Sequence, residues 1–203
     1  MSISLTIDLN DRDLEHFNNA MVAARKTAEG KSPEEVIDAA GRLLADAQKV
    51  HVPDFILERL LHLDDMIAMV RDAGWNLPEE DKQRVMSALV YFADPTDVIP
   101  DNIEVLGFLD DAIMIELCVK ELKHELDAYE DFCDFRQHEA EKRGVNPAAV
   151  ERAEWLASRR EELQDRMHTR RERDFGTGYG SSSGYAAKRT YTRGWRPTEF
   201  KFR

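Results

Sequence analysis

The chain has 203 residues, of which 42% are hydrophobic and 33% are charged, enough for one domain with appendages or for two small domains. Its uninterrupted apolar runs are only a few residues long, whereas a bilayer-spanning helix needs about 18–20. The N-terminus lacks the basic flank and apolar block of a signal peptide. We therefore expect a protein of a bacterial-type cytoplasm. The same surroundings would keep both cysteines reduced, and Cys118 and Cys133 are too far apart on one predicted helix to bond to each other.

The formal net charge of −12 is unevenly distributed. Residues 175–203 contain six Lys and Arg against one Glu, a net charge of +5, which leaves −17 on residues 1–174. An acidic body with a basic tail indicates either an anionic partner for the tail or a tail that folds back on the body.

The N-terminal third predicts one strand and two helices. Apolar and polar residues alternate over 3–9, which is strand periodicity. A lone strand is rarely stable, so we expect it to pair with a second copy of the chain, as a homodimer, or to run extended along the helices. Helices are predicted over about 11–28 and from Pro33 to 47, because Ser32 and Glu35 form a capping box before the second.

This order of strand, helix, turn and helix resembles that of ribbon-helix-helix DNA-binding proteins, in which a strand from each subunit enters the major groove. The outward residues of the strand would be Ser4, Thr6 and Asp8. They include no cation, although affinity for DNA comes largely from cationic contacts with phosphates. A dimeric DNA-binding protein is therefore one alternative, and a dimerising or core-covering strand is favoured over it.

Helical periodicity continues through the rest of the body. Two further helices are predicted before residue 94, and a continuous apolar stripe then predicts one long helix from Phe108 to Arg143. The last helix, over 147–174, has only a thin apolar seam, which is typical of a helical hairpin or coiled coil. The Gly/Ser-rich and basic residues beyond it cannot bury a core, so we predict a tail that is disordered until bound.

These patterns together predict an all-α protein: a helical bundle with a short N-terminal strand or extended arm, a long central helix and a disordered C-terminal tail. Its predicted parts are an N-terminal strand with two helices (1–50), a helical core containing the long helix (51–143), a charged C-terminal helix (144–174) and a basic-aromatic tail (175–203).

One stretch within the core carries a family resemblance. Residues 97–111 read D-V-I-P-D-N-I-E-V-L-G-F-L-D-D, which resembles the D-L-I-P-D-F-I-P-V-L-G-Y-L-D-D hallmark of the YkvA-like family (domain of unknown function 1232). The resemblance covers roughly residues 85–120. Glu104 replaces a second proline and Asn102 replaces an aromatic residue. The resemblance implies a small helical module and brings no established activity.

Three roles compete for the aspartates of this stretch. They can cap helices and fix the loop, together with Pro100 and Gly107. They can supply oxygen ligands to Mg²⁺ or Ca²⁺, in a divalent-metal site with hydrolytic potential. They can also dock a basic segment, including the protein's own tail. The aspartates in question are Asp97, Asp101, Asp110 and Asp111.

The pattern apolar-Pro-Asp followed by Leu-Asp-Asp occurs twice, at 52–65 and at 99–111. This repetition suggests a duplicated helix-loop unit, and it adds Asp54, Asp64 and Asp65 as a second acidic group. Chance is the competing explanation, because Leu-Asp-Asp is common at helix starts.

The tail carries the chemistry best suited to binding. Cations that reach phosphates alternate with aromatic rings that stack on bases, a combination suited to RNA or a nucleoprotein surface. A solubilising or self-docking tail is the alternative. No catalytic motif is found elsewhere, so we predict a non-enzymatic cytoplasmic interaction protein. The candidate binding residues are Lys188, Arg189, Tyr191, Arg193, Trp195, Arg196, Lys201 and Arg203.

Overall fold

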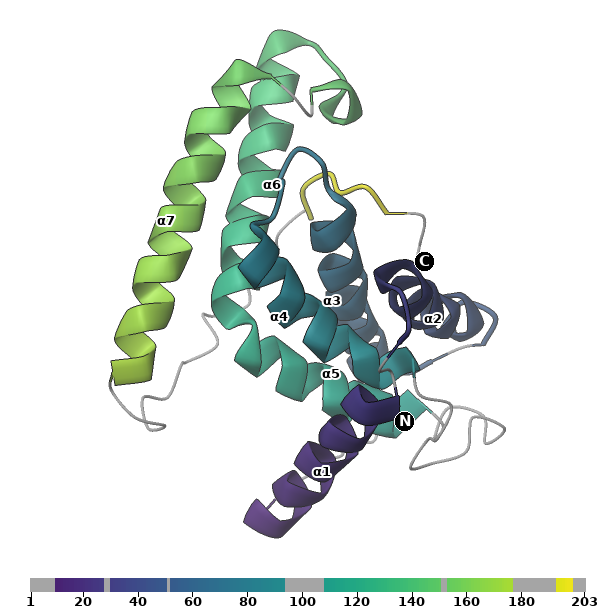
Figure 1. Cartoon of the computed structure of the whole chain (residues 1–203). Coiled ribbons are helices and arrows are strands. Elements are labelled where there is room, and N and C mark those ends of the chain that lie inside the picture. The colour runs from purple at the N-terminus through teal and green to yellow at the C-terminus, as the bar shows by residue number, and fades with distance from the viewer. Residues whose placement is uncertain are drawn as a thin grey trace.

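The computed structural model describes residues 10–27, 30–50, 52–93, 108–150, 153–176 and 193–198. These residues form helices and their connections, with no strand among them, so the all-α prediction is confirmed for this part of the chain. The predicted strand over residues 3–9, with its dimer and DNA-binding alternatives, lies outside the described residues. Figure 1 shows the helices gathered around α3, with α7 and α6 side by side at one edge.

The two N-terminal helices are α1 (Asp11–Thr27) and α2 (Pro33–Ala47). The capping box predicted for α2 is confirmed. The Ser32 hydroxyl accepts a hydrogen bond from the Glu35 N–H at 3.2 Å, and the Glu35 carboxylate accepts one from the Ser32 N–H at 2.7 Å. Two of the donors that a helix start leaves unpaired are thus satisfied.

The central helix α3 (Asp54–Arg71) is followed by α4 (Glu79–Leu89) and the short 3₁₀ helix η1 (Val90–Ala93). The turn between α3 and α4 is anchored by the fully buried Trp75. Its ring lies 5.1 Å from the ring of Phe132 and 5.9 Å from that of Tyr129, centre to centre. None of the described helices has the length and apolar character needed to cross a bilayer.

The prediction of one long helix from Phe108 to Arg143 is wrong. The structure has α5 (Leu109–Glu121) and α6 (Lys123–Arg143), which meet at Leu122. The ψ angle of Leu122 is 19°, far from the helical value of about −42°, so the chain turns there. Figure 1 shows the two helices running in different directions. No Gly or Pro marks the break; the apolar stripe continues, and the fully buried Leu122 belongs to the core.

The C-terminal helices form the predicted hairpin. After α6, Gly144 takes a positive φ of 65°, which ends the helix as expected, and the 3₁₀ helix η3 (Pro147–Ala149) follows. The predicted start of the last helix at 147 is wrong, because α7 spans Glu154–Gly176. Its thin seam packs on the bundle, burying Leu156, Leu163 and Met167.

Residues 193–198 of the tail, which we predicted to be disordered until bound, are docked on the body. This segment, yellow in Figure 1, packs against α3 and α6, with Gly194 and Arg196 buried. The physical reason is charge. The segment has little apolar surface to bury, but its arginines reach aspartates of the body.

Candidate functional site: the tail-binding surface

The tail-binding surface, as we name it, consists of one face of α3 and one of α6. Five carboxylate, amide and guanidinium side chains and one short backbone stretch contact the tail segment 193–198. The two faces lie about 70 residues apart in sequence, so only the folded bundle brings them together. The surface comprises Asp64, Asp65, Cys133, Asp134, Arg136 and Gln137.

Arg193 is the tail residue most extensively bound by α3. Its Nη2 lies 2.8 Å from Oδ2 of Asp64, and its Nε lies 3.1 Å from Oδ1 of Asp65. The same Nη2 also donates to the backbone carbonyl of Leu61 at 3.3 Å. The other oxygen of Asp64 accepts a hydrogen bond from the Thr198 hydroxyl. Asp64 is 1% exposed, so both of its oxygens are satisfied largely by the tail.

Arg196 contacts Asp65, the second aspartate of this pair. Its Nε lies 2.6 Å from Oδ1 of Asp65, an ion pair without the alignment of a hydrogen bond. Its Nη1 donates to the carbonyl of Gly194 at 2.8 Å, and its guanidinium lies 5.9 Å from the centre of the Tyr129 ring. One carboxylate, Asp65, therefore forms ion pairs with two tail arginines.

Trp195 is held by Arg136 and Gln137 of α6. The guanidinium of Arg136 lies 4.5 Å from the centre of the indole ring, a cation–π contact, and its Nη2 donates to the Trp195 carbonyl at 3.1 Å. The N–H of Trp195 donates to Oε1 of Gln137 at 3.3 Å. Both backbone groups of Trp195 are thus paired with side chains of the body.

Arg136 is itself held in position by Asp72 in the core. It is fully buried and forms two parallel bonds to the buried Asp72, at 2.9 and 2.7 Å. Asp72 also accepts from the Tyr129 hydroxyl at 2.9 Å and from the Gly74 N–H at 2.9 Å. A bidentate pair of this kind sets the plane of the guanidinium. The face that Arg136 presents to Trp195 is therefore oriented by the core.

Gly194 permits the close approach of the tail to α6. A Cβ atom at this position would lie 2.7 Å from Oδ1 of Asp134, 2.9 Å from the Cys133 carbonyl carbon and 3.0 Å from the Asp134 nitrogen. Two of these are backbone atoms of a helix, which cannot move aside. The Gly194 N–H also donates to the Asp134 carboxylate. Any larger residue would displace the tail.

The electrostatics of the site follow from this packing. For Arg193, desolvation by burial disfavours the charged form, but the carboxylates of Asp65 and Asp64 outweigh it and raise its pKa. For Asp134, desolvation by burial raises the pKa, Arg196 and the Gly194 N–H oppose the rise, and the neighbouring Asp131 adds to it. The tail thus supplies a positive charge and an N–H donor that oppose the rise in the pKa of Asp134.

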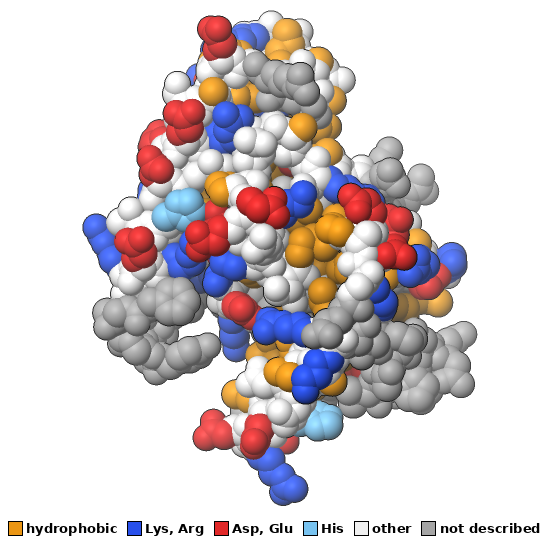
Figure 2. Space-filling model, viewed as in Figure 1, with side chains coloured by type: hydrophobic (Ala, Val, Ile, Leu, Met, Phe, Trp, Pro, Cys, Tyr) orange, Lys and Arg blue, Asp and Glu red, His pale blue; other side chains and the backbone are white. Residues whose placement is uncertain are grey.

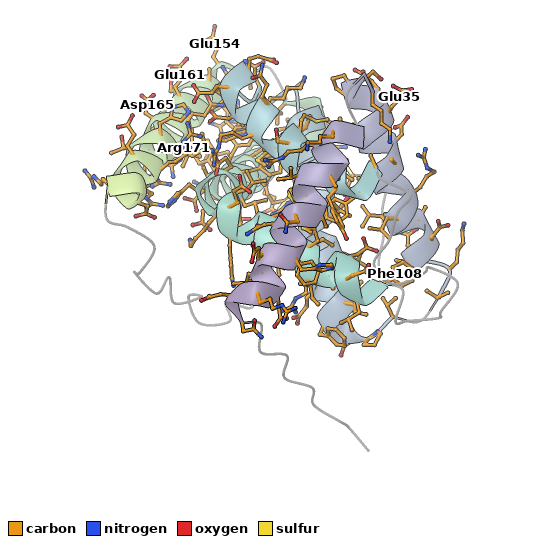
Figure 3. All side chains as sticks on the ribbon, turned by 60° about the horizontal axis from the view of Figure 1, so that its bottom comes forward. Glu35, Phe108, Glu154, Glu161, Asp165 and Arg171 are labelled. Atoms are coloured by element: carbon orange, nitrogen blue, oxygen red, sulfur yellow. The ribbon has the colours of Figure 1, made fainter. Side chains whose placement is uncertain are left out.

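A second cluster of charges joins α4, α6 and α7. Asp81 and Glu125 are both fully buried. Arg171 of α7 bridges them with Nη1, 2.5 Å from Asp81 and 2.9 Å from Glu125. His168 lies 2.7 Å from Asp81, and Arg84 lies 2.9 Å from Glu125. Figure 3 shows Arg171 on the side of α7 that faces the bundle, whereas Glu161 and Asp165 lie on its outer side.

The aspartates of the family-like stretch are only partly described. Asp110 and Asp111 lie in the first turn of α5, where negative charge complements the helix dipole, and both are buried. Asp97, Pro100, Asp101 and Gly107 lie outside the described residues. Within the described ranges, no group of three or more His, Cys, Asp or Glu side chains has the arrangement of a metal site. The capping and metal-binding roles of the full stretch therefore remain predictions.

Of the predicted tail residues, the structure brings three together on the body: Arg193, Trp195 and Arg196. The other five lie outside the described residues: Lys188, Arg189, Tyr191, Lys201 and Arg203.

The sequence did not identify Asp64 and Asp65 as the tail's partners, although it singled them out as half of a repeated pattern. The two Leu-Asp-Asp sites differ in context, because Leu63-Asp64-Asp65 lies in the middle of α3 and Leu109-Asp110-Asp111 begins α5. A helix-loop duplication is therefore not seen in the first copy. Arg136 and Gln137 were not singled out from the sequence, because no motif in the sequence includes them.

Comparison with known proteins identifies the family. Residues 82–117, which include most of α4 and α5, match the family described as "Protein of unknown function (DUF1232)". The chain is also 35% identical over 75 residues to the "Uncharacterized membrane protein YkvA" of Bacillus subtilis (strain 168), a match that covers 34% of this chain and 69% of that relative. No solved structure matches the chain. The resemblance seen in the D-V-I-P-D motif is thus confirmed, and the chain belongs to the YkvA-like family of unknown function, DUF1232.

Proposed function

We propose that this protein is an interaction protein whose basic-aromatic tail alternates between two partners: the tail-binding surface of its own body and an external polyanion, RNA or the RNA-rich surface of a nucleoprotein. One observation carries the proposal. Arg193, Trp195 and Arg196, which the sequence marks as anion-binding residues, are engaged by carboxylates and by Arg136 in the docked position.

The two partners exclude each other for a chemical reason. The guanidinium nitrogens that contact Asp64 and Asp65 cannot bind a phosphate at the same time, and the indole face that covers Arg136 cannot at the same time stack on a base. On the face shown in Figure 2, acidic and basic side chains are interspersed, and no broad basic patch is seen among the described residues. The docked tail is the stored form in this proposal, and the released tail is the binding form.

The energetics allow such an exchange. The side chains of Arg193 and Asp65 are 30% and 14% exposed, so water and salt reach this ion pair. Exposed ion pairs contribute only about 0–1 kcal/mol each. Docking within one chain is helped by an effective concentration on the order of millimolar. A polyanion that offers many phosphates at once can overcome that advantage, because it also binds the other tail cations.

The test is RNA binding by the full-length chain, followed by anisotropy of a labelled single-stranded RNA at low and moderate salt. Asp65→Asn should bind RNA more tightly than the wild type, because it removes the carboxylate that contacts both tail arginines and so weakens docking of the tail, although Asp64 still contacts Arg193. Arg193→Gln/Arg196→Gln should bind more weakly. Asp46→Asn is the matched control, since Asp46 is an exposed aspartate of α2 that pairs with the neighbouring Lys49. Equal affinity of the Asp65 and Asp46 variants would reject the proposal.

An anionic membrane surface is the second candidate partner, because the similar protein of Bacillus subtilis is named a membrane protein. Aromatic and basic residues in alternation suit the headgroup region of an anionic bilayer, and they would bring a cytoplasmic protein to the membrane without a spanning helix. Co-sedimentation of the same variants with vesicles of anionic and of neutral lipid separates the two candidates. Binding to anionic vesicles without binding to RNA would select the membrane.

A further inference from the structure

We infer that the tail-binding surface is a receptor for segments of the form Arg-Gly-Trp-Arg, and that a partner protein carrying such a segment takes the place of the docked tail. This inference concerns the body rather than the tail, so it does not rest on what the released tail binds. It is argued position by position from the contacts of residues 193–196.

The contacts with the acidic pair require two arginines in a ligand of this surface. Arg193 bridges Asp64 and Asp65, and Arg196 contacts the same Oδ1 atom of Asp65 as Arg193. Asp64 is nine-tenths or more buried and has little access to water, so it depends on a cation for compensation. A lysine would supply charge but could not bridge the two carboxylates through separate nitrogens. A ligand of this surface therefore carries arginines three residues apart.

The close contact with α6 requires glycine at the second position of the ligand segment. The tail backbone lies so close to Cys133 and Asp134 of α6 that a Cβ atom at position 194 would come within 3.0 Å of the helix backbone. Real Cβ atoms do not approach backbone atoms this closely. Plain electrostatic attraction would show no such requirement. The glycine therefore distinguishes recognition of a specific segment from non-specific binding of basic peptides.

The contact with Arg136 favours tryptophan at the third position of the ligand segment. The guanidinium is fully buried with the tail in place, it is oriented by two bonds to Asp72, and it presents one face to the indole ring at 4.5 Å. Arg136 also binds the Trp195 carbonyl, and Gln137 binds the Trp195 N–H. An aromatic ring is the side chain that a fixed cation face prefers, and a cationic side chain there would be repelled.

The surface is pre-organised without the tail. Arg136 and Asp72 lie in the core next to Tyr129, and Asp64 and Asp65 lie in the middle of α3. No part of this framework is contributed by residues 193–198. When the tail leaves, a rigid complementary site remains, with a buried aspartate and a buried arginine that each lose partners. An external segment of the same pattern restores those contacts, and this partner is the occupant that we propose.

The experiment uses the full-length chain in two forms, wild type and the tail variant Arg193→Gln/Trp195→Ala/Arg196→Gln, which vacates the surface. The probe is a fluorescent peptide with the sequence of residues 191–198, measured by anisotropy. The tail variant should bind this peptide at least about ten-fold more tightly than the wild type, whose own tail competes at an effective concentration on the order of millimolar. Peptides with Gly→Ala or Trp→Ala at the central positions should each bind about ten-fold more weakly, a loss of about 1.4 kcal/mol.

Two matched variants test the protein side. Asp65→Asn, placed in the tail variant, should weaken peptide binding, and Asp46→Asn should leave it unchanged. Circular dichroism and the unfolding midpoint of each variant show whether the body remains folded.

Three outcomes would overturn the inference. A scrambled peptide of the same composition that binds as well would reveal plain charge attraction. Absence of binding to the vacated surface would show that it is no receptor. A wild-type dimer that forms with rising concentration and is lost in the tail variant would identify a second copy of the chain as the occupant in place of a partner protein.

Discussion

The body holds two C-terminal segments by the same ionic chemistry, but with different permanence. At the α7 cluster, Arg171 bridges the buried carboxylates of Asp81 and Glu125. At the tail-binding surface, Arg193 bridges Asp64 and Asp65. The ion pairs are alike, and the segments that carry the arginines are not.

The difference lies in apolar burial. The α7 helix adds three fully or almost fully buried side chains, Leu156, Leu163 and Met167, each worth about 1.5–3 kcal/mol. The described tail segment adds one aromatic ring, Trp195, which is only partly buried. Ion pairs alone contribute little net stability, because desolvation offsets their attraction. Charge therefore sets where each segment binds, and apolar burial decides whether it can leave.

The largest effect is expected at the α7 cluster. Arg171→Met leaves two fully buried carboxylates with one partner fewer, and removal of one member of a buried pair costs about 3–5 kcal/mol. We expect the lower end of this range, because His168 and Arg84 still hold the carboxylates. Urea unfolding measures the change, with the exposed Arg170→Met as control. A decrease in the free energy of unfolding of less than about 1 kcal/mol would show that the α7 cluster is no more stabilising than the exposed ion pairs, contrary to the expected difference between the two clusters.

At the tail-binding surface, Asp65→Asn should change the free energy of unfolding by less than about 1 kcal/mol. Its ion pair with Arg193 is partly exposed, and Arg196, which is buried in the docked tail, can regain water when the segment leaves. The same variant should release the tail. Cleavage by trypsin after Arg193 should become up to about five-fold faster, as expected for the loss of up to about 1 kcal/mol of docking free energy. Asp46→Asn serves as control. Unchanged cleavage together with a large loss of stability would show that the tail is a fixed part of the fold.

Raising the salt concentration should affect the tail-binding surface more than the α7 cluster, without any mutation. The Debye length falls from about 10 Å at 0.1 M salt to about 3 Å at 1 M, which weakens exposed ion pairs more than buried ones. Trypsin cleavage after Arg193 should accelerate with salt, relative to cleavage of a free tail peptide. Hydrogen exchange in α7 should stay unchanged. If salt accelerated tail cleavage and α7 hydrogen exchange equally, the two segments would be held with the same permanence.

The smallest effect concerns Asp131, which lies between the two regions on α6 and pairs with Arg166 of α7. Burial raises the pKa of Asp134, and the negative charge of Asp131 raises it further. Asp131→Asn should therefore lower the pKa of Asp134, measured by NMR titration of its carboxyl carbon. The raised pKa means that Asp134 favours the folded state at low pH, and that this contribution disappears as the pH rises through its pKa. A pKa that rises in the variant would contradict this electrostatic account.

Local signals in the sequence predicted local structure well. The Ser32–Glu35 capping box, the helix end at Gly144 and the thin seam of the last helix all rest on residues within one or two helical turns, and the structure confirms each. The break at Leu122 was missed because no local residue causes it; α5 packs on α3, α6 packs on α7, and the change of partner turns the chain.

The tail-binding surface was half predicted. The basic-aromatic tail was identified from its composition, and docking on the body's own aspartates was one of the alternatives for its charge. Its partners could not be chosen, because Asp64 is 129 residues from Arg193 in sequence, and its helix had to be placed beside Arg136 first. The close contact at Gly194 depends on backbone geometry, which composition does not reveal.

The most direct test of the account is hydrogen exchange of the Trp195 N–H, which donates to Gln137 in the docked tail. We predict slow exchange of residues 193–198 in the free wild-type protein and fast exchange in Asp65→Asn. Exchange of the wild-type tail should also become fast after addition of the peptide from residues 191–198, while α7 stays protected. Fast exchange of Trp195 in the free wild-type protein would contradict the account, because the tail would then have no stable position on the body.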